Sequence, residues 1–258
     1  MKIVGFIPAR MGSSRFPGKP LADILGKAMI EHVYYRSKLS DKLDDLYIAT
    51  PDKEIEDYCL SRDIKVVMTS PVHERATDRT AEATQKIENK TNEKIDIVIL
   101  IQGDEPLLYP EMINLALKPL INDSNILTSN LMSPLKSIEE QEDPNEVKVV
   151  VDKDNFALYF SREPIPSRKK GAKNFVTMKQ VCIMPWRRDF LFKYTSLKQT
   201  PLEIIESVDT LRCIENGFKV KMVPCDFNTY SVDTINDLNK VREMMKKDSL
   251  FLKYSNIR

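Results

Sequence analysis

The chain has 258 residues, of which 42% are hydrophobic and 30% charged, and its 39 basic side chains nearly balance 38 acidic ones. This near-neutral charge argues against a nucleic-acid-binding protein, which usually carries a basic excess. No apolar run approaches the roughly 18 residues of a membrane helix, and the N-terminus shows no apolar secretory segment. We therefore expect a cytoplasmic protein that does not enter a membrane, folded as one domain over residues 1–258.

Cysteines and histidines are too few and too scattered to suggest a metal centre. The chain has four cysteines, and no two of them form a C-x-x-C pair, so neither a zinc site nor a disulfide framework is indicated. With only His32 and His73 present, a histidine-rich metal site is not expected either. The cysteine pattern is that of a protein kept in a reducing compartment.

Strand and helix patterns alternate along the first half of the chain. Apolar runs predict strands at residues 2–8, 46–50, 65–69 and 95–106. Helical spacing of apolar residues predicts helices between them, at residues 28–39, 52–63 and 78–90. The alternation indicates right-handed crossovers and a mainly parallel sheet with helices on both faces. Ligands bind such sheets at the carboxyl ends of the strands, where we expect Arg10, Thr50, Thr69 and Asp104.

The second half contains strands with fewer helices between them. Strands are predicted at residues 148–152, 157–162, 181–186 and 219–225, and helices at residues 201–217 and 234–247. Gly217 would end the first of these helices, and Asp233 or Thr234 would cap the N-terminus of the second. The proline- and lysine-rich connection at residues 162–174 indicates a surface loop or a dimer arm.

The segment "FIPARMGSSRFPGKP" follows the first predicted strand and suits a triphosphate. Its glycine spacing fits neither the Walker A pattern nor the G-x-G-x-x-G of dinucleotide folds. Backbone N–H groups around Gly12 and Ser14 and the positive charges of Arg10, Arg15 and Lys19 are nevertheless suited to phosphate oxygens. The alternative is an ordinary solvated basic loop.

Two aspartates follow predicted strands and are candidate metal ligands. Asp104 ends the apolar strand in "LIQGDEP", and Asp233 stands between a strand-like stretch and a helix in "YSVDTINDL". Mg²⁺ bound beside nucleotide phosphates takes one or two carboxylates, with phosphate oxygens and waters completing its shell. The alternatives are a turn at Asp104 and, more in keeping with the local sequence, a helix N-cap at Asp233.

Together these segments resemble the 3-deoxy-manno-octulosonate (KDO) cytidylyltransferases. The resemblance extends in order over almost the whole chain, through "PARMGSSRFPGKPLADILGKAMIEHV", "MTSPVHERATDRTAEA", "IQGDEPLL", "DPNEVKVVVDKDNFALYFSREPIP", "TPLEIIESVDTLR" and "YSVDTINDLNKVR". An ordered match of this length is far more specific than any single motif.

The resemblance implies a fold, a reaction and an assembly. The fold would be a three-layer α/β nucleotidyltransferase (Rossmann-like) fold with a mixed, mainly parallel sheet and a dimerisation arm in the second half. Residues 1–120 would mainly bind CTP, and residues 121–258 would bind the acceptor and form a homodimer. The enzyme would use Mg²⁺ to transfer CMP from CTP to the anomeric hydroxyl of a 2-keto sugar acid, releasing pyrophosphate, for cell-envelope polysaccharide synthesis.

The resemblance also assigns roles to individual residues. The catalytic residues would be Arg10, Lys19 and Asp104. The nucleotide would be bound by Ala9, Arg10, Gly12, Ser14, Arg15, Lys19, Thr69, Arg79 and Gln102. The metal ligands would be Asp104 and Asp233. The acceptor pocket would include Arg75, Arg162, Gln180 and Glu206.

The acceptor half departs from the family pattern. Two family histidines are replaced by Gln180 and Ile204, and a Ser-Gly pair is replaced by Arg75-Ala76. One interpretation is drift with local compensation. The other is a different anionic acceptor, such as an amino-substituted KDO or another nonulosonic or uronic-type acid, because lost imidazoles would leave hydroxyls of the usual sugar unpaired. A non-catalytic homologue that only binds nucleotide is the rival from another class.

Overall fold

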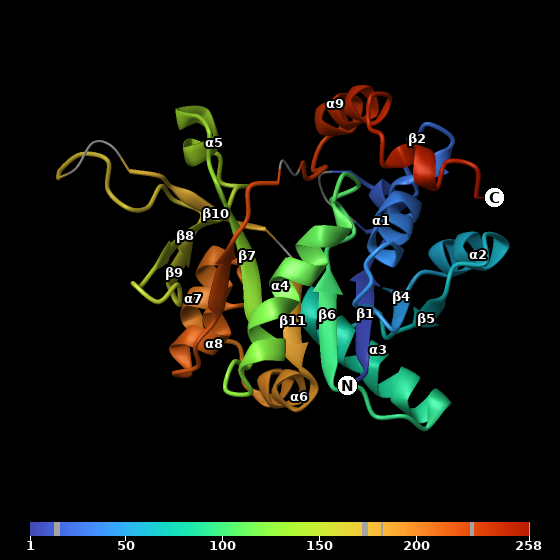
Figure 1. Ribbon diagram of the computed structural model, residues 1–258, viewed down its shortest axis with the longest axis horizontal. Coiled ribbons are helices and arrows are strands. Elements are labelled where there is room, and N and C mark those ends of the chain that lie inside the picture. Colours follow the sequence, from blue (N-terminus) through green and yellow to red (C-terminus); the bar gives the residue numbers. More distant parts are fainter. Residues whose placement is uncertain (13–15, 172–174, 182, 228–229, 258) are drawn as a thin grey trace. The chain divides into compact units, whose positions relative to one another are not determined.

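The computed structural model describes residues 1–12, 16–171, 175–181, 183–227 and 230–257. The chain divides into two compact units, which we describe separately (Figure 1). The first unit comprises residues 1–114 and 228–258, and the second comprises residues 115–227. The mixed α/β architecture is the predicted one, whereas the single domain, its CTP and acceptor halves and the dimerisation arm remain predictions.

The first unit contains four parallel strands in the order β6-β1-β4-β5. Their bounds are β1 (Ile3–Pro8), β4 (Asp45–Thr50), β5 (Val66–Met68) and β6 (Ile97–Ile101). Every residue of β6 is buried, as expected for a parallel strand covered on both faces. The four predicted strands of this half are confirmed. The fourth, β6, ends at Ile101 and does not continue through the acidic residues as predicted.

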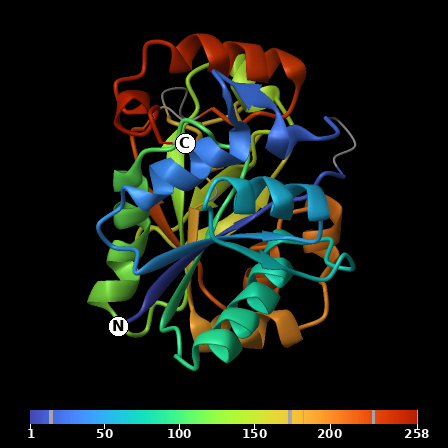
Figure 2. The same ribbon diagram turned by 90° about the vertical axis from the view of Figure 1, so that its right-hand side faces the viewer.

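Three helices cover the two faces of this sheet. Their bounds are α1 (Met29–Lys38), α2 (Lys53–Ser61) and α3 (Ala76–Thr91). Figure 2 shows α1 and α2 on one face of the sheet and α3 on the other. The chain therefore builds from β1 outward to β4 and β5, then returns through α3 to place β6 on the other side of β1. Between β1 and β6 the strand order reverses, and such a reversal is where α/β sheets bind ligands.

Shorter elements complete the first unit. They are the 3₁₀ turn η1 (Lys19–Leu21), the hairpin of β2 (Asp23–Ile24) and β3 (Lys27–Ala28), the helix α9 (Ile235–Met245) and the 3₁₀ turn η2 (Phe251–Lys253). Helix α4 (Pro110–Asn122) runs across the boundary between the units. Within the described part of the chain, no helix is both long enough and apolar enough to cross a bilayer.

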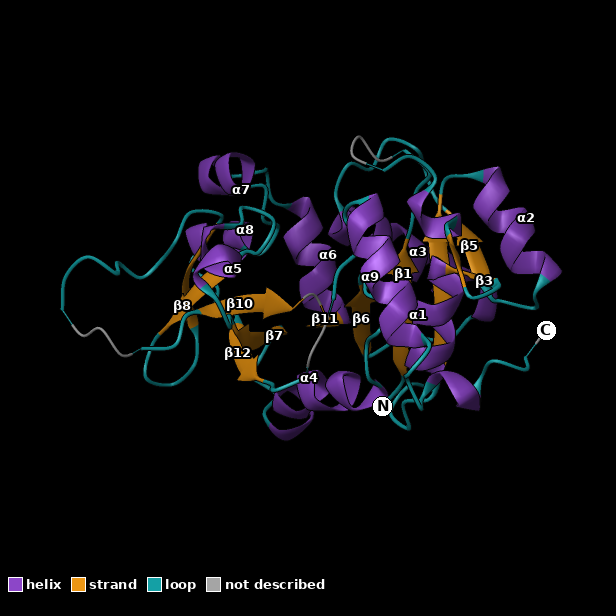
Figure 3. Cartoon of the chain, turned by 90° about the horizontal axis from the view of Figure 1, so that it is seen from above, coloured by secondary structure: helices purple, strands orange, loops and turns teal. Residues whose placement is uncertain are grey.

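The second unit has a mixed sheet in the order β12-β7-β10-β8-β9 (Figure 3). The bounds are β7 (Ser129–Pro134), β8 (Lys148–Val151), β9 (Ala157–Ser161), β10 (Met178–Val181) and β12 (Lys221–Pro224). Only β12 and β7 pair in parallel, and the other neighbours are antiparallel. The remaining elements are α5 (Ile138–Glu142), β11 (Ile183–Arg187), α6 (Arg188–Ser196), α7 (Pro201–Glu206) and α8 (Leu211–Glu215).

Two predicted elements of the second unit are wrong in extent. The strand expected at residues 181–186 is two strands, β10 and β11, with Cys182 between them outside the described residues. The helix expected at residues 201–217 is also divided, because Ser207 adopts left-handed backbone angles (φ 53°, ψ 49°) that end α7. Gly217 does follow the end of α8 as predicted. Its φ is 77°, its N–H donates to Ile214 O, and the N–H of Phe218 donates to Cys213 O, which is a Schellman arrangement.

The start of α9 decides between the two expected caps. Thr234 is the N-cap, and its hydroxyl accepts the N–H of Asp237, whose carboxylate in turn accepts the N–H of Thr234. This is a capping box, with Asp in place of the usual Glu. The side chain of Asp233 is thereby released from capping, so the N-cap interpretation of Asp233 is wrong.

Candidate active site

A pocket of about 310 Å³ lies in the first unit at the carboxyl ends of β1 and β6. Its lining brings together the segments after both strands, the start of α3, and residues from η1, α1 and the stretch before α9. The lining residues are Pro8, Ala9, Arg10, Gly12, Lys19, Pro20, Met29, His73, Glu74, Arg75, Ala76, Arg79, Gln102, Gly103, Asp104 and Asp233. The pocket therefore lies at the carboxyl ends of the strands, where the sequence predicted ligand binding, and at the point where the strand order reverses.

The loop after β1 is held at both ends by backbone hydrogen bonds. The N–H of Ala9 donates to Ala49 O (2.9 Å), and the N–H of Met11 donates to the Asp52 carboxylate (2.7 Å). At the far end, the N–H of Gly18 donates to Met11 O (3.0 Å). Gly18 has a φ of 75°, which a residue with a Cβ rarely adopts.

Between these anchors the loop carries two of the predicted nucleotide-binding residues into the pocket. Arg10 and Gly12 are exposed and line it. Ser14 and Arg15, also predicted to bind the nucleotide, lie outside the described residues. These hydrogen bonds help to hold Arg10 and Gly12 at the pocket.

Lys19 connects the two predicted metal ligands. Its ammonium lies 3.0 Å from a carboxylate oxygen of Asp104 and 3.5 Å from one of Asp233. The same nitrogen donates to Val232 O at 2.7 Å. Only 13% of the Lys19 side chain is exposed, compared with 30% for Asp104 and 20% for Asp233, so this cluster is largely shielded from water.

The turn that carries Asp104 packs closely against β1. A Cβ on Gly103 would lie 3.2 Å from Pro8 O and 3.4 Å from the Ile7 side chain. Glycine therefore lets the end of β6 approach the end of β1. This close approach brings Gln102 and Asp104 to the same pocket as the loop after β1.

Arg79 is a buried arginine that organises the wall of the pocket. Its guanidinium donates to the Thr69 hydroxyl (2.6 Å), to Ser70 O (3.1 Å) and to His73 O (2.9 Å). Burial and the positive charge of Arg10 both lower the pKa of Arg79. Thr69 is itself buried and bonded to Arg79, so its contribution to the pocket is to hold this arginine.

The sequence reasoning missed His73 and Glu74, which line the pocket beside Arg75. The ring Nε2 of His73 lies 2.5 Å from the Glu82 carboxylate on α3. Burial alone would raise the pKa of Glu82, but hydrogen bonds from Lys86, the Ser70 N–H and His73 outweigh it, and the pKa is lowered. The position of His73 in the chain could have indicated its place in the pocket. It lies between the end of β5 and the start of α3, where the segments that follow the strands line the ligand-binding edge of the sheet.

In the second unit, Arg162 and Glu206 are bound to each other and to the surrounding backbone. The Arg162 guanidinium donates to the carbonyl groups of Pro144, Glu206 and Ser207. Two of these carbonyls belong to the end of α7, where a helix leaves its last C=O groups without helical partners. The sequence did not predict that α7 ends at Ser207. At this end, Arg162 supplies the hydrogen-bond donors for the carbonyl groups of Glu206 and Ser207.

The Glu206 carboxylate accepts three hydrogen bonds from β9 and the residue after it. The donors are the Tyr159 hydroxyl (3.0 Å), the Ser161 hydroxyl (3.0 Å) and the Arg162 N–H (2.8 Å). Partial burial would raise the pKa of Glu206, but these bonds and the Arg162 charge outweigh it, and the pKa is lowered. Both residues predicted for the acceptor pocket therefore also join α7 to β9.

Gln180 and Ile204 mark the positions where the family pattern has histidine. Gln180 lies on the half-buried strand β10. Within the described residues its side-chain amide makes one weak contact, with the Met184 sulfur at 3.8 Å. Ile204 is 57% exposed on α7. Neither replacement is used to fill the core of the second unit.

The donor set suits a hard cation that is bound together with substrate. Among the described residues, no group of three or more His, Cys, Asp or Glu side chains is placed to hold a metal by itself. Asp104 and Asp233, however, both reach the same point in space, now taken by the Lys19 ammonium. Two carboxylates that depend on phosphate oxygens to complete the shell are the arrangement Mg²⁺ favours in nucleotide sites.

The chain matches known proteins over nearly its whole length. The cytidylyltransferase family model matches residues 4–222. The KDO cytidylyltransferase of Geotalea uraniireducens is 40% identical over 257 residues, covering 96% of this chain and all of that protein. The mitochondrial KDO cytidylyltransferase of Arabidopsis thaliana is 41% identical and covers 96% of this chain and 85% of its own length.

A solved structure agrees with the sequence matches. The structure of CMP:2-keto-3-deoxy-manno-octonic acid synthetase complexed with CTP superposes with a TM-score of 0.87 at 37% identity, covering 96% of this chain and 99% of that one. Fold and sequence therefore agree, and the chain belongs to the KDO cytidylyltransferase family of nucleotidyltransferases.

Proposed function

We propose that this enzyme transfers CMP from CTP to the anomeric hydroxyl of KDO or a closely related 2-keto sugar acid. The hydroxyl oxygen attacks the α-phosphorus of CTP, the bond to the β-phosphate oxygen breaks, and pyrophosphate leaves with its electron pair. The hydroxyl proton passes to solvent. The observation that carries the proposal is the Lys19 ammonium, held between Asp104 and Asp233 at the strand-order reversal. The names and CTP complex of the similar proteins support the donor and the acceptor class.

Arg10, Gly12 and Lys19 would receive the triphosphate. All three line the same pocket, and two of them bring positive charge to it. Nucleotidyl transfer depends mainly on in-line positioning and on neutralising phosphate charge, so a histidine base is not required. Gln102, which directly follows β6 and lines the pocket, is placed to contact the nucleotide beside Asp104.

Asp104 and Asp233 would hold Mg²⁺ with the phosphates. The bound ion would lower the pKa of the attacking hydroxyl and stabilise negative charge as it develops. In its presence Lys19 would turn its ammonium from the carboxylates toward the phosphates, where it offsets the charge of the leaving pyrophosphate. Removal of divalent cations with a chelator should therefore abolish turnover, and Mg²⁺ should restore it.

The acceptor is the less determined substrate. Arg75 adds a cation to the wall of the pocket, and Gln180 and Ile204 replace family histidines, so an amino-substituted KDO or another anionic sugar acid is the alternative acceptor. A homodimer in the cytoplasm would make this product, which would then serve cell-envelope polysaccharide synthesis. These assignments rest on the family and on the chemistry of the pocket residues.

The test is a matrix of four nucleoside triphosphates against several sugar acids, with pyrophosphate release as the readout. We expect release with CTP and a KDO-type acid in the presence of Mg²⁺. Preference for an amino-KDO or another acid would keep the chemistry and change the acceptor. If no pair of nucleotide and acid yields pyrophosphate, the chain is a non-catalytic homologue and the proposal is wrong.

A further inference from the structure

We infer that Val232 and Asp237 form a positioning unit that sets the geometry of Lys19, Asp104 and Asp233. The inference rests on the proposed function, because it assumes that this cluster binds the cation and the CTP phosphates. Neither residue is placed to touch substrate. Both act through the backbone on either side of Asp233.

The peptide groups of Val232 contact the other two members of the cluster. Its N–H donates to Asp104 O at 2.9 Å, and its C=O accepts the Lys19 ammonium at 2.7 Å. One residue therefore holds the backbone that carries Asp104 and accepts the shortest hydrogen bond that Lys19 makes within the described residues. Any shift of Val232 would move both partners relative to the Asp233 carboxylate, which comes next in the chain.

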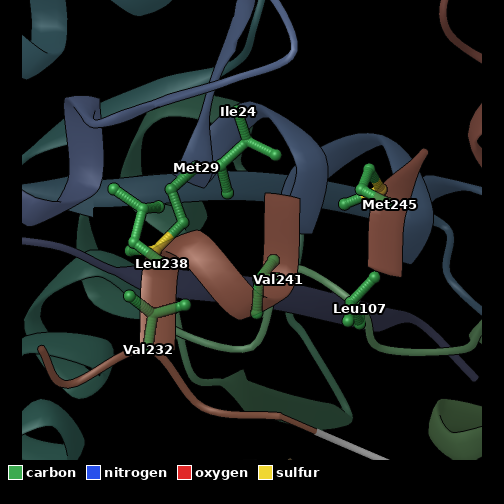
Figure 4. Packing of buried hydrophobic residues seen from close by; sticks show 7 residues of the cluster. All are labelled: Ile24, Met29, Leu107, Val232, Leu238, Val241 and Met245. Atoms are coloured by element: carbon green, nitrogen blue, oxygen red, sulfur yellow. The ribbon is translucent and has the colours of Figure 1, made fainter. Parts of the chain in front are cut away.

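The side chain of Val232 anchors this backbone in the hydrophobic core of the first unit. It is fully buried in a cluster to which α9, β2, α1 and the turn after β6 contribute (Figure 4). The other members are Ile24, Met29, Leu107, Leu238, Val241 and Met245. Met29 belongs to this cluster and also lines the pocket, so the cluster reaches the pocket at this residue. Because cores are packed as densely as organic crystals, a truncated side chain here leaves the backbone less well defined.

Asp237 holds the peptide groups on the other side of Asp233. One of its carboxylate oxygens accepts the N–H of Asp233 (3.2 Å), the N–H of Thr234 (2.9 Å) and the Thr234 hydroxyl (2.8 Å). Asp237 lies in the first turn of α9, where a negative charge is also favoured by the helix dipole. The capping box thus does more than begin a helix, since it fixes the main chain from which the Asp233 carboxylate extends.

The reaction is sensitive to such positioning. A displacement of about 1 Å in a group that orients reactants can reduce the rate by about 10²-fold, even when its source is remote from the chemistry. Loosening Val232 or Asp237 should therefore lower kcat and weaken cation binding while the fold is retained. A purely structural residue would lower stability alone.

The experiment compares Val232→Ala with Val98→Ala. Val98 is also a fully buried valine of the first unit, but it lies in the amino-terminal half of β6, away from the pocket. Mn²⁺ affinity in the presence of CTP, measured by electron paramagnetic resonance without turnover, is the first readout. Hydrogen exchange of the Val232 N–H, thermal unfolding and kcat are the others.

We expect Val232→Ala to weaken Mn²⁺ binding about fivefold and to lower kcat about 10- to 100-fold, with faster exchange of the residue 232 N–H. Val98→Ala should lose similar thermal stability and change both functional values by less than about twofold. Val232→Ile, which keeps a branched apolar side chain, should restore Mn²⁺ affinity. Asp237→Ala alters a half-buried helix start with little risk to folding, and should change Mn²⁺ affinity in the same direction as Val232→Ala.

Equal Mn²⁺ affinity and kcat in Val232→Ala and Val98→Ala, together with wild-type affinity in Asp237→Ala, would overturn the inference. Asp233→Asn separates this failure from failure of the proposed function. If Asp233→Asn binds Mn²⁺ with CTP and turns over as the wild type does, the cluster is not the cation site and the proposed function loses its main support. If Asp233→Asn is impaired and the Val232 and Asp237 variants are not, only the positioning unit is wrong.

Discussion

Arg10 in the first unit and Arg162 in the second have the same guanidinium group and the same expected task of binding an anion, but the fold uses them differently. Arg10 is exposed at the mouth of the pocket. Arg162 donates to three backbone carbonyls, two of them at the end of α7. An arginine that donates hydrogen bonds to the last carbonyl groups of a helix can still attract an anionic ligand. Its removal, however, leaves those carbonyl groups without their donor.

The carboxylates show the same contrast. Asp104 and Asp233 face the Lys19 ammonium, which under the proposed function would give way to a metal ion and phosphates. Glu206 accepts hydrogen bonds from three neighbours in its own unit. The comparison indicates that Arg10, Asp104 and Asp233 of the first unit line a pocket, whereas Arg162 and Glu206 of the second unit mainly bind groups of their own unit.

Asp104→Asn should produce the largest effect and tests the first half of this comparison. The change removes one of two negative charges from the cation site, and loss of one preorganised electrostatic group typically lowers kcat by about 10²–10³-fold. The free energy of unfolding should change by less than about 1 kcal/mol, because Asp104 is partly exposed and its backbone bond to Val232 remains. Steady-state pyrophosphate release and urea denaturation measure the two quantities. Wild-type turnover would show that Asp104 is not a metal ligand.

Arg79→Ala and Arg10→Ala divide the cations of the first unit into structural and ligand-binding ones. Loss of Arg79 leaves three acceptors of the pocket wall without their donor, so the free energy of unfolding should fall by about 2–4 kcal/mol. Arg10→Ala should change stability by less than about 0.5 kcal/mol and weaken CTP binding instead. Urea denaturation and calorimetric titration with CTP are the measurements. An equal loss of stability in both variants would contradict the division.

Sequence patterns predicted the four parallel strands and the helices α1 to α3 of the first unit well, because β1, β4 and β6 are nearly continuous buried runs and the helices have clear apolar faces. The elements of the second unit were harder to predict for identifiable reasons. Ser207 adopts left-handed backbone angles, which a serine in the sequence does not predict. Arg162, which binds the helix end at this point, is distant in sequence. The division of residues 181–186 into two strands likewise depends on pairing partners that periodicity does not reveal.

The candidate site was predicted from strand ends and from family resemblance. The structure shows which of the predicted residues line one pocket and which do not. Arg10, Lys19, Asp104 and Asp233 do line one pocket. The sequence could not show that Thr234, rather than Asp233, caps α9, because adjacent Asp and Thr residues are both good caps and only the register of the first turn decides. His73 was missed because a lone histidine carries no local pattern, and its partner Glu82 lies nine residues away in the sequence, on α3.

Glu206→Gln tests whether the second unit uses this carboxylate for stability. The pKa of Glu206 in the folded state is below the usual value of 4.5. The Glu206 charge therefore contributes fully to the free energy of unfolding above pH 4.5, and this contribution is lost as the pH falls through the lower pKa of the folded state. We expect Glu206→Gln to reduce the free energy of unfolding by about 1 kcal/mol at pH 7, and the difference from wild type to shrink below pH 4.5. Urea denaturation at several pH values measures it. A difference that is constant with pH would mean that the charge of Glu206 does not stabilise the unit.

Gln180→His should have the smallest effect on the fold and the most specific effect on function. Within the described residues, the Gln180 side-chain amide contacts only a sulfur atom, at 3.8 Å. Restoring the family histidine should therefore change the free energy of unfolding by less than about 0.5 kcal/mol. If Gln180 contacts the acceptor, the KM for the sugar acid should change by about 10-fold, the range of one hydrogen bond, while the KM for CTP stays constant. Kinetics with KDO and an amino-substituted KDO, each at saturating CTP, distinguish these values. Improved use of KDO would show that Gln180 sets a different acceptor preference. An unchanged KM for both acids would place Gln180 outside the acceptor site and leave Arg75 and Ile204 as the departures from the family pattern to test for specificity.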